Sequence, residues 1–382
     1  MTSESLYDLP SEHKDLRDSV RALALKEIAP FAHDVDETAR FPQEAYEALQ
    51  RAGLASAHVP TEFGGEGADA LAVVLIVEEI ARVCGSSSLI PAVNKLGALP
   101  LMISGTTEQK QRWLRPAAQG KGFSYCLSES GAGSDAAALR TKAVRSGDRW
   151  IISGSKKWIS NAGFSDFYTV MASTDPDRRD AGITAFILEK SDPGLSFGAH
   201  EKKMGFRGSP TREVYFDNVE ISDDRRITPV NEGFSVAMET LDHTRITIAA
   251  QALGLAQGAL DVASKYAHER TQFGKPIFEF QGIQFMLADM AMNIEAARQL
   301  TYAAAAKSDL RDPDLKFFAA ACKTFASDTA MKVTTDAVQI MGGYGYVSDY
   351  PVERMMRDDK LTQIYEGTNQ IQRIIMARNI KQ

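Results

Sequence analysis

The sequence predicts an α+β protein with an N-terminal α-helical domain, a middle antiparallel β-barrel domain and a C-terminal four-helix bundle. Three textures along the 382 residues support this order. Apolar residues recur at helical spacing up to about residue 120, and short runs rich in β-branched and aromatic residues then alternate with Gly, Asp, Ser and Pro clusters. Long alanine-rich helical runs resume near residue 233. We therefore expect domains over residues 1–120, 121–228 and 229–382.

The first domain contains helices whose ends carry suitable capping residues. In "SEHKDLRDSVRALALKEIAPFAHDV" apolar residues lie one helical turn apart, and Ser11 is a suitable N-cap. "PQEAYEALQRAGL" begins with Pro42 and reaches Gly53 near its end, which is the usual asymmetry of a helix. A buried apolar helix follows. "TTEQKQRWLRPAAQG" is then expected to start at a Thr107 cap and to stop at Gly120.

The middle domain is predicted from runs with strand composition, and the last domain from long runs with helical periodicity. The runs "FSYCLSE", "RWIISGSKKWIS", "FYTVMAS", "ITAFILE" and "REVYFDNVEI" have the composition of strands. Their spacing favours an antiparallel barrel or sandwich of about 100 residues. "FSVAMETLDHTRITIAAQALGLAQGALDVASKYAHER" and two further long helical runs come next, with a last helix near "TNQIQRIIMARNI". Helices of this length suit an antiparallel bundle.

Composition argues against several functional classes. The formal net charge of −7 disfavours a surface for nucleic acid, because phosphate contacts need clustered Lys and Arg. Cys84, Cys126 and Cys322 are far apart, which argues against a disulfide framework or a metal site and favours a reducing, cytoplasmic setting. The start of the chain lacks the basic and apolar regions of a signal peptide. Its most apolar run meets two glutamates too early to span a membrane.

The stretch "ESGAGSDAA" contains GAGSDA, which fits the G-x-G-x-x-A form of the dinucleotide fingerprint. A true fingerprint opens a long helix within a βαβ unit, but here strand character returns after at most two helical turns. Asp135 would also repel a pyrophosphate. The stretch is therefore expected to be a different loop. It is either a plain surface turn or an anion- or ring-edge-binding nest built from backbone N–H groups and the hydroxyls of Ser128 and Ser134.

Eight motifs in order across the three textures resemble the acyl-CoA dehydrogenase family. "CLSESGAGSD" (126–135) looks like the first signature of that family and "QIYEGTNQIQRIIMARNI" (363–380) like the second. "PTEFGGEGAD", "KKWISNAG", "MGFRGSPTREVYFDNV", "LDHTR", "RTQFG" and "QIMGGYGY" stand before and between them. The resemblance implies a FAD-dependent enzyme of fatty acid β-oxidation that converts a saturated acyl-CoA to trans-2-enoyl-CoA. It also implies electron transfer to an electron-transferring flavoprotein and a homotetramer, a dimer of dimers.

The resemblance also implies a catalytic base, Glu366, in "IYEGT". An apolar setting beside Ile364 and Tyr365 would raise the pKa of Glu366 towards the working pH. Gly367 would let the backbone pass close to the thioester without a Cβ. A subset of the family carries the base in the "LDxxR" helix, but this chain has Thr244 there, which cannot act as a carboxylate. In the family the backbone N–H of the glutamate also polarises the thioester carbonyl.

The flavin ring is expected, by the same resemblance, beside the first signature and "KKWIS". Trp158 would pack on the ring, although without the motif it could equally be a core residue of the barrel. Ser160 keeps the hydroxyl of the Thr that many relatives carry at that position. The expected residues around the ring and its phosphates are Tyr125, Leu127, Ser128, Gly133, Ser134, Trp158, Ile159 and Ser160.

A second set of expected FAD residues lies in the last domain, and in the family part of this set comes from a neighbouring subunit. Arg270 could instead be a charge that favours a helix C-terminus, and the two glycines a helix stop. Thr368 is also a natural N-cap for the last helix. The set is Arg270, Phe273, Gln281, Gln339, Gly342, Gly343, Thr368 and Gln370.

The acyl-CoA is expected between helices of the first and third domains. Asp242 and Arg245 could alternatively form an i, i+3 ion pair on a helix face. Bulky aliphatic side chains in "SSLIPAVNKLG", namely Leu89, Ile90 and Val93, would form the floor of the acyl pocket and favour short or medium chains. The expected substrate-binding residues are Ser134, Asp242, Thr244, Arg245 and Gly367.

Three alternatives differ in chemistry. The same fold can serve as an oxidase that uses O2, although such relatives are generally longer, and this chain stops soon after the Glu366 motif. A non-catalytic relative that binds DNA or acts as a scaffold would be expected to show a basic groove or to lose the glutamate. A nicotinamide enzyme would depend on the GAGSDA match alone.

Overall fold

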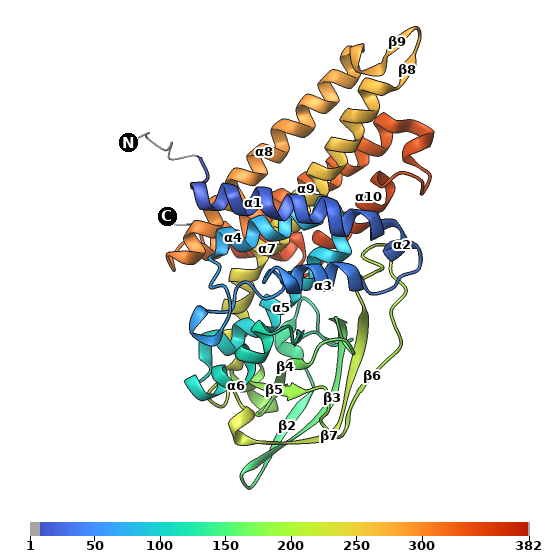
Figure 1. The fold of residues 1–382 in the computed structure, drawn as a ribbon. Helices are drawn as coiled ribbons and strands as arrows, with labels where there is room; N and C mark the ends of the chain where they lie inside the picture. Colours follow the sequence, from blue (N-terminus) through green and yellow to red (C-terminus); the bar gives the residue numbers. More distant parts are fainter. Residues whose placement is uncertain (1–7, 381–382) are drawn as a thin grey trace.

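The computed structural model describes residues 8–380 and contains both helices and a sheet. Figure 1 shows the sheet at one end and the N-terminal helices across the middle. The long C-terminal helices run past them to a small hairpin at the opposite end. The predicted order of helical, β and helical regions is therefore confirmed.

Six α-helices form the N-terminal region, and their ends refine the predicted caps. The helix predicted to start at Thr107 is capped by Thr106, whose hydroxyl accepts from the N–H of Gln109 at 3.2 Å in a capping box. Ser11 is the first helical residue rather than the cap. Gly53 follows one helix with φ +70°. The helices are α1 (Ser11–Leu23), α2 (Ala32–Glu37), α3 (Gln43–Arg51), α4 (Ala70–Ala81), α5 (Gly85–Ser104) and α6 (Thr107–Ala118).

Seven strands form one curled sheet in the order β1-β4-β2-β3-β7-β6, with β5 paired to β4. The predicted antiparallel arrangement holds for most strand pairs but is wrong for two, because β1 pairs with β4 in parallel and β2 meets β4 in parallel at one position. A parallel pair needs a crossover, and the β2–β3 hairpin lies within that connection. The strands are β1 (Phe123–Cys126), β2 (Lys142–Ser146), β3 (Arg149–Ser160), β4 (Phe167–Ser173), β5 (Ile183–Glu189), β6 (Leu195–Phe197) and β7 (Thr211–Ser222).

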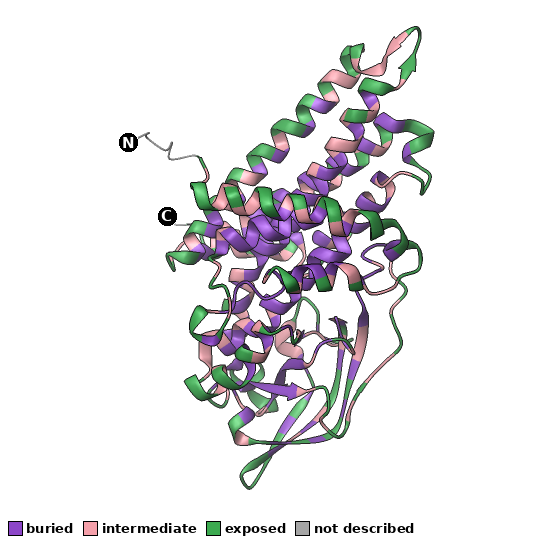
Figure 2. Ribbon diagram, viewed as in Figure 1, coloured by how far each residue is buried: buried purple, intermediate pink, exposed green. Residues whose placement is uncertain are grey.

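The C-terminal region is built on three long helices that pack against one another. The central one, α7, also packs against α4 and α5, which joins the two helical regions around a shared core (Figure 2). The short β8–β9 hairpin and α10 were not predicted. The elements are α7 (Gly233–Glu269), β8 (Thr271–Gln272), β9 (Lys275–Pro276), α8 (Gln281–Asp309), α9 (Leu315–Met341), α10 (Val352–Thr362) and α11 (Asn369–Arg378).

Within residues 8–380, α7 alone is long and apolar enough to cross a membrane by length and composition. However, 78% of its most apolar window is buried inside the protein. A core helix meets the same criteria, and the packing of α7 against α4, α5, α8 and α9 identifies it as one.

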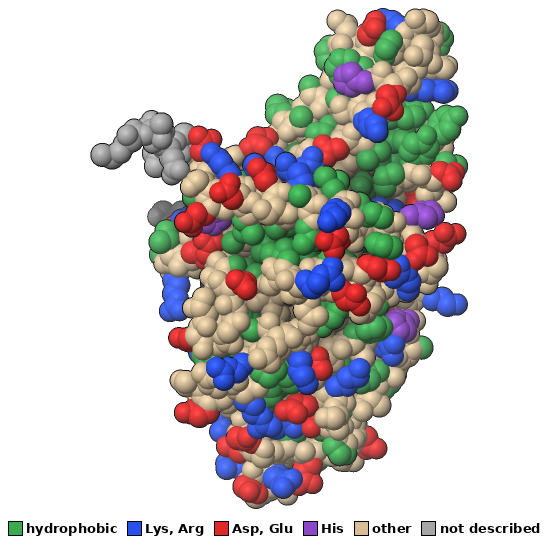
Figure 3. Space-filling view, viewed as in Figure 1, with side chains coloured by type: hydrophobic (Ala, Val, Ile, Leu, Met, Phe, Trp, Pro, Cys, Tyr) green, Lys and Arg blue, Asp and Glu red, His purple; other side chains and the backbone are tan. Residues whose placement is uncertain are grey.

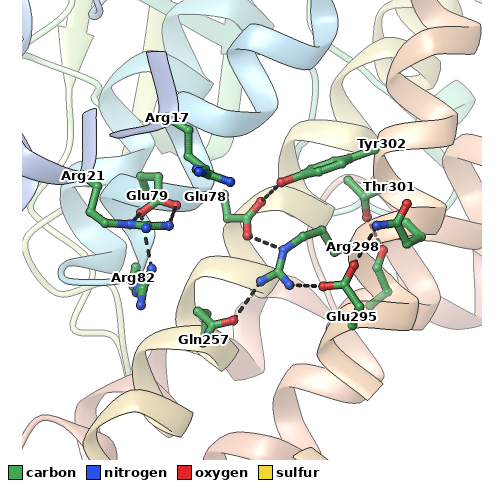
Figure 4. A network of polar contacts seen from close by, with 12 residues as sticks. Arg17, Arg21, Glu78, Glu79, Arg82, Gln257, Glu295, Arg298, Thr301 and Tyr302 are labelled. Atoms are coloured by element: carbon green, nitrogen blue, oxygen red, sulfur yellow. Dashed lines mark hydrogen bonds and ion pairs between the residues drawn. The ribbon is translucent and has the colours of Figure 1, made fainter. Parts of the chain in front are cut away.

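A polar network joins the N-terminal helices to the C-terminal ones (Figure 4). On α4, Glu78 accepts from Arg298 at 2.9 Å and from Tyr302 at 3.0 Å, and both donors belong to α8. The neighbouring Glu79 accepts two hydrogen bonds from Arg21 of α1, at 2.8 and 2.6 Å. Burial raises the pKa of Glu78, and the Arg298 guanidinium opposes that rise. The network therefore depends on charges that the packing has taken out of water.

Candidate active site

The turn between α10 and α11 carries Glu366 in an unusual backbone conformation. Glu366 has φ +51° and Gly367 has φ +94°. A Cβ at Gly367 would lie 2.7 Å from the side-chain nitrogen of Gln372, so this position requires glycine. Thr368 caps α11, because its hydroxyl accepts from the N–H of Ile371 at 3.3 Å, as predicted. A non-glycine residue in the left-handed region is a form of strain that is concentrated at functional sites.

Two buried side chains hold this turn in place. Gln372 Nε2 donates to the carbonyl oxygens of Glu366 and Gly367, at 3.0 and 2.9 Å. Lys323 Nζ of α9 donates to the carbonyl of Gly367 at 3.0 Å and to Asn369 Oδ1 at 2.8 Å. Burial lowers the pKa of Lys323 to about 7, although the charge of Glu366 acts in the opposite direction. The turn is thus fixed from both α9 and α11.

The Glu366 carboxyl points towards α7. Thr244 Oγ1 donates to its Oε2 at 2.7 Å, and Arg245 Nε donates to the backbone carbonyl of Glu366 at 3.3 Å. Burial raises the pKa of Glu366 to about 6, against the hydrogen bond from Thr244 and the charges of Arg245, Lys323 and Lys95. The predicted direction of this pKa shift is confirmed. Ile364, which was expected to provide apolar cover, is instead about half exposed.

A hydrogen-bonded chain ties the same turn to α7 and α5. The hydroxyl of Tyr365 donates to Gln251 Oε1 of α7. Gln251 Nε2 donates to Ser88 Oγ of α5 at 2.6 Å, and Ser88 donates in turn to the carbonyl of Gly85 at 2.6 Å. The three hydrogen-bonded side chains, those of Tyr365, Gln251 and Ser88, lie at or near the buried core. The base is therefore positioned relative to both helical regions.

The first signature lies at the end of β1, and Tyr125 links it to the base. Tyr125 is buried, and within residues 8–380 its hydroxyl has no hydrogen-bond partner. Burial and the charge of Glu366 both raise the pKa of Tyr125. Since the carboxylate of Glu366 acts on this phenol, the structure brings the two signatures together although 240 positions separate them in the sequence. Leu127 is buried beside Tyr125 and Ser128 is partly exposed.

The glycine-rich loop is anchored at one end and open along its middle. Glu129 accepts from Lys156 Nζ at 2.8 Å and from the N–H groups of Arg140 and Thr141, at 2.7 and 2.9 Å. Among the described residues 8–380, no atom lies within 4 Å of a Cβ placed on Gly131 or Gly133. Ser134 is exposed on the same loop. A single 3₁₀ turn and then β2 follow, so the rejection of a dinucleotide fingerprint is confirmed.

Trp158 lies at an irregularity of β3, where the register with β7 shifts between Lys156 and Ile159. It has φ +64°, and its side chain is 57% exposed. The alternative interpretation as barrel core is therefore wrong, because the register shift turns the indole outwards. Ile159 is buried, Ser160 is partly buried, and the Lys157 ammonium lies 4.8 Å from the indole centroid. An exposed indole on a strained strand fits a ligand-binding role.

Asp242 and Arg245 of α7 form the i, i+3 ion pair that was the structural alternative to a substrate-binding role. Arg245 Nη1 lies 2.5 Å from Asp242 Oδ1, and both side chains are buried. Because Arg245 also reaches the Glu366 carbonyl, the pair belongs to the wall of the candidate site as well. The predicted pocket-floor residues of α5 are all buried: Leu89, Ile90 and Val93.

The second predicted FAD set divides in two within one chain. Thr368 and the exposed Gln370 stand beside Glu366. The others lie at the far end of α7, α8 and α9, next to the β8–β9 hairpin (Figure 1). There Phe273 is 94% exposed, and the Arg270 guanidinium lies 5.4 Å from the ring centroid of Tyr344. The members at this end are Arg270, Phe273, Gln281, Gln339, Gly342 and Gly343.

A single chain thus contains two separate groups of expected cofactor residues. Apolar side chains gather on the surface near the outer group (Figure 3). Exposed apolar residues in this part of the sequence include Tyr344, Tyr346 and Val347. Exposed apolar clusters of this kind mark interaction sites.

The residues of the first signature and of β3 fit a planar, hydrogen-bonding ring such as a flavin. The partnerless hydroxyl of Tyr125 offers a buried polar contact, Trp158 offers an exposed aromatic face, and Gly131 and Gly133 leave open backbone for phosphate oxygens. The Glu366 carboxyl, whose charge acts on Tyr125, has a pKa of about 6 that suits a general base. The arrangement can therefore bind a flavin and remove a proton beside it.

Sequence reasoning missed the buried residues that support the base. Lys323 and Gln372 are fully buried, and Lys95 of α5 is nearly so. A lone Lys in the alanine-rich run "FFAAACKTFAS" was the available signal for Lys323, because a charge within such a run requires a specific partner. No comparable signal marked Gln372.

Comparison with known proteins shows the family to which this chain is similar. Three family profiles match: the acyl-CoA dehydrogenase N-terminal domain over residues 10–121, the middle domain over 124–219 and the C-terminal domain over 231–381. A probable acyl-CoA dehydrogenase of Mycobacterium leprae is 59% identical over 374 residues, covering 98% of this chain and 96% of that protein.

Two solved structures are also similar to this chain. A chain from a study of the electron transferring flavoprotein of Acidaminococcus fermentans has a TM-score of 0.95 and 45% identity, covering 98% of this chain and 99% of its own. Butyryl-CoA dehydrogenase from Megasphaera elsdenii has a TM-score of 0.94 and 41% identity, covering 97% and 98%.

Proposed function

The chain belongs to the acyl-CoA dehydrogenase family, and from that premise we propose the roles of its residues in the reaction. Members of this family are FAD-dependent oxidoreductases that act on acyl-CoA thioesters, and the chain is such a dehydrogenase. The roles below are supported by the geometry around Glu366. The observation that carries them is a partly buried carboxyl group, held by Thr244 on a left-handed turn, with a pKa raised to about 6.

Glu366 removes the proton from the α-carbon of the acyl-CoA. A general base works best when its pKa lies near the working pH, and burial moves Glu366 in that direction. Thr244 and the cations Arg245 and Lys323 keep a large fraction of the carboxyl ionised at neutral pH. Bound FAD supplies the acceptor for the hydride that leaves the β-carbon, giving a trans-2-enoyl-CoA.

The backbone N–H of Glu366 polarises the thioester carbonyl. Within residues 8–380 this N–H donates to no protein acceptor, while the carbonyl of the same residue is held by Arg245 and Gln372. In this left-handed conformation the carbonyl of Glu366 is held while its N–H is left for a ligand. An N–H aimed at the developing negative charge lowers the barrier to proton removal.

The other expected residues hold the two ligands. Tyr125, Leu127, Ser128, Gly133, Trp158, Ile159 and Ser160 would bind the flavin half of FAD. Ser134 would contact either ligand, and Asp242, Arg245 and Gly367 would contact the acyl-CoA. The outer group around Arg270 and Phe273 would bind the adenosine half of a FAD held by a neighbouring subunit. The separation of the two groups in one chain and the exposed apolar residues near the outer group support that assignment.

Assembly, partner and location complete the proposal. A homotetramer of this chain would pass its electrons to an electron-transferring flavoprotein in the cytoplasm. Among residues 8–380, the three cysteines are free and buried, which suits a reducing compartment. The curled sheet would act as the antiparallel-rich barrel of residues 121–228, and α7, α8, α9 and α11 as the four-helix bundle of residues 229–382, with a helical domain over residues 1–120.

The Glu366→Gln variant tests the base. The variant should keep its yellow FAD and bind acyl-CoA, yet bleach about 10²- to 10⁴-fold more slowly when mixed anaerobically with saturated acyl-CoAs, the range attributed to a general base. Glu62→Gln, a change of an exposed glutamate in the N-terminal region, is the matched control and should bleach at the wild-type rate. Wild-type bleaching by the Glu366 variant would refute the assignment. Fast consumption of O2 by the reduced wild-type enzyme would favour an oxidase instead.

A further inference from the structure

Lys95 is a buried cation whose charge acts on Glu366, but the mechanism above gives its ammonium no hydrogen-bond partner. It lies on α5, with 7% of its surface exposed. Within the described part of the chain, its ammonium makes no hydrogen bond and no ion pair. Burial lowers the pKa of Lys95 to about 8. Proteins rarely bury a lysine unless it is paired, because burying a charge without a partner is costly.

Lys95 faces the same side of α5 as the residue that is tied to the base. Ser88 and Lys95 are seven residues apart, close to two full helical turns, so their side chains leave α5 in nearly the same direction, about 10 Å apart along its axis. Ser88 is joined through Gln251 to Tyr365, the neighbour of the base. The Glu366 carboxylate is also among the charges that act on Lys95. The ammonium therefore lies on the base-facing side of α5, along the helix that provides the expected floor of the acyl pocket.

A second buried polar group without a partner lies in the same region. Asn94 Nδ2 donates to the carbonyl of Ala55 at 2.9 Å, which ties the segment that leads to His58 to α5 next to Lys95, and the charge of Lys95 acts on His58. His58 is 7% exposed, and within residues 8–380 its Nε2 has no hydrogen-bond partner. Burial and then the charge of Lys95 lower the pKa of His58 to about 3, so the ring is neutral. The unpaired Nε2 of His58 and the ammonium of Lys95, whose charge acts on that ring, form the outline of a binding site.

The surrounding charges indicate what kind of oxygen the site would accept. The carboxylates of Asp69 and Asp309 act on Lys95, but each is engaged elsewhere, with the N–H of Ala72 at 2.7 Å and the N–H of Ala70 at 2.8 Å. These two negative charges offset the single positive charge of Lys95. A carboxylate on the acyl tail of a ligand would be repelled by Asp69 and Asp309. A neutral oxygen would accept a hydrogen bond from Lys95 without that repulsion.

The remaining titratable groups near Lys95 do not change this balance. His243 of α7 is held by Ser308 at 2.7 Å, and burial lowers its pKa to about 4. The charges of Lys95 and Arg311 lower it further, so His243 is neutral at pH 7. The net charge around the ammonium is therefore not positive.

We propose that Lys95, with His58, binds a neutral hydrogen-bond-accepting oxygen on the acyl chain, so that the preferred substrates are acyl-CoAs oxygenated along the tail. This inference rests on the proposed function, which places the acyl tail along α5. It adds a polar anchor to a pocket whose floor is otherwise aliphatic. The oxygen would make the hydrogen bond that the buried ammonium lacks within the protein.

A scan of keto positions tests the inference. Unsubstituted acyl-CoAs are compared with equally long acyl-CoAs that carry one ketone at C5, C6 or C7 and with ω-carboxyl acyl-CoAs, using the holoenzyme and an artificial electron acceptor. One keto position should give a kcat/KM about tenfold or more above that of the unsubstituted chain. In Lys95→Met this ratio should fall about tenfold to a hundredfold, the range for losing a hydrogen bond to a charged group. An effect of Lys95 on the ionisation of Glu366 cancels in the ratio.

The controls separate this inference from the proposed function. Lys26→Met, a change of an exposed lysine just after α1, should leave the ratio unchanged. Lys95→Met should also raise the melting temperature, because it removes an unpaired buried charge. A lower melting temperature would show that Lys95 has a structural role and would overturn the inference. So would equal kcat/KM values at every keto position, or a preference for the ω-carboxyl chain. Failure of all the acyl-CoAs to bleach the flavin would refute the proposed function itself.

Discussion

Replacing Thr244 with Val should shift the pH dependence of the enzyme in a direction that the structure fixes. The Thr244 hydroxyl donates to Glu366 Oε2 at 2.7 Å, and this hydrogen bond opposes the rise in the pKa of Glu366 that burial causes. A hydrogen bond to a charged group contributes about 1.5–3 kcal/mol, which corresponds to about 1–2 pKa units. Because the bond favours the ionised form, its loss should raise the pKa of Glu366 from about 6 to roughly 7–8.

The consequence for activity follows from the ionised fraction of Glu366. At pH 7 that fraction should fall from about nine-tenths to between about a half and a tenth, so kcat/KM should drop about two- to tenfold and recover near pH 9. The assay is the pH profile of kcat/KM, which reports the pKa of the free enzyme. Thr240→Val is the matched control, because that hydroxyl on the same helix bonds only to the carbonyl of Val236. A Thr244→Val profile that coincides with the wild-type profile would refute the reasoning.

Three further substitutions test the supporting structure. Lys156→Met removes the ammonium that pairs with Glu129 at 2.8 Å, and apoprotein titrated with FAD should bind it about tenfold more weakly; an unchanged Kd would count against this anchor. Gly367→Ala places a Cβ 2.7 Å from Gln372 Nε2 at φ +94°, so both turnover and melting temperature should fall, and wild-type values for both would contradict the strain argument. Glu78→Ala removes the carboxylate that pairs with the partly buried guanidinium of Arg298 on α8, so the free energy of unfolding in urea should fall by about 3 kcal/mol. A loss below about 1 kcal/mol would show that the network contributes little to stability.

The sequence predicted the order of the regions better than the way the strands connect. Helix ends with strong local signals were found, as at Thr368, whose hydroxyl caps α11. Thr106 and Thr107 could both act as a cap, and the prediction of Thr107 was wrong. Thr106 is the cap because it forms reciprocal hydrogen bonds with Gln109. The parallel pairing of β1 with β4 could not be predicted, because strand composition does not specify the direction of a neighbour that lies about 40 residues away.

Within the site, the motifs named residues that the structure brings together, but they did not name residues whose role depends on burial. Glu366 and Thr244 were both singled out from the sequence, and the structure joins them by a hydrogen bond. The importance of Lys323 and Lys95 depends on helices that pack together only in the folded chain. Trp158 was given a core alternative because tryptophan is usually buried, and a register shift in β3 overrides that tendency.

The loop after β1 has a consequence for how natural sequence variation in it should be interpreted. Glu129 anchors the loop at one end, whereas within residues 8–380 no protein atom lies near the place where a side chain of residue 131 or 133 would begin. An alanine at either position would therefore have nothing in its own subunit to collide with. A loss of activity caused by such an alanine would have to arise from a clash with a bound molecule or a neighbouring subunit. These two positions can therefore report on ligand contact separately from folding.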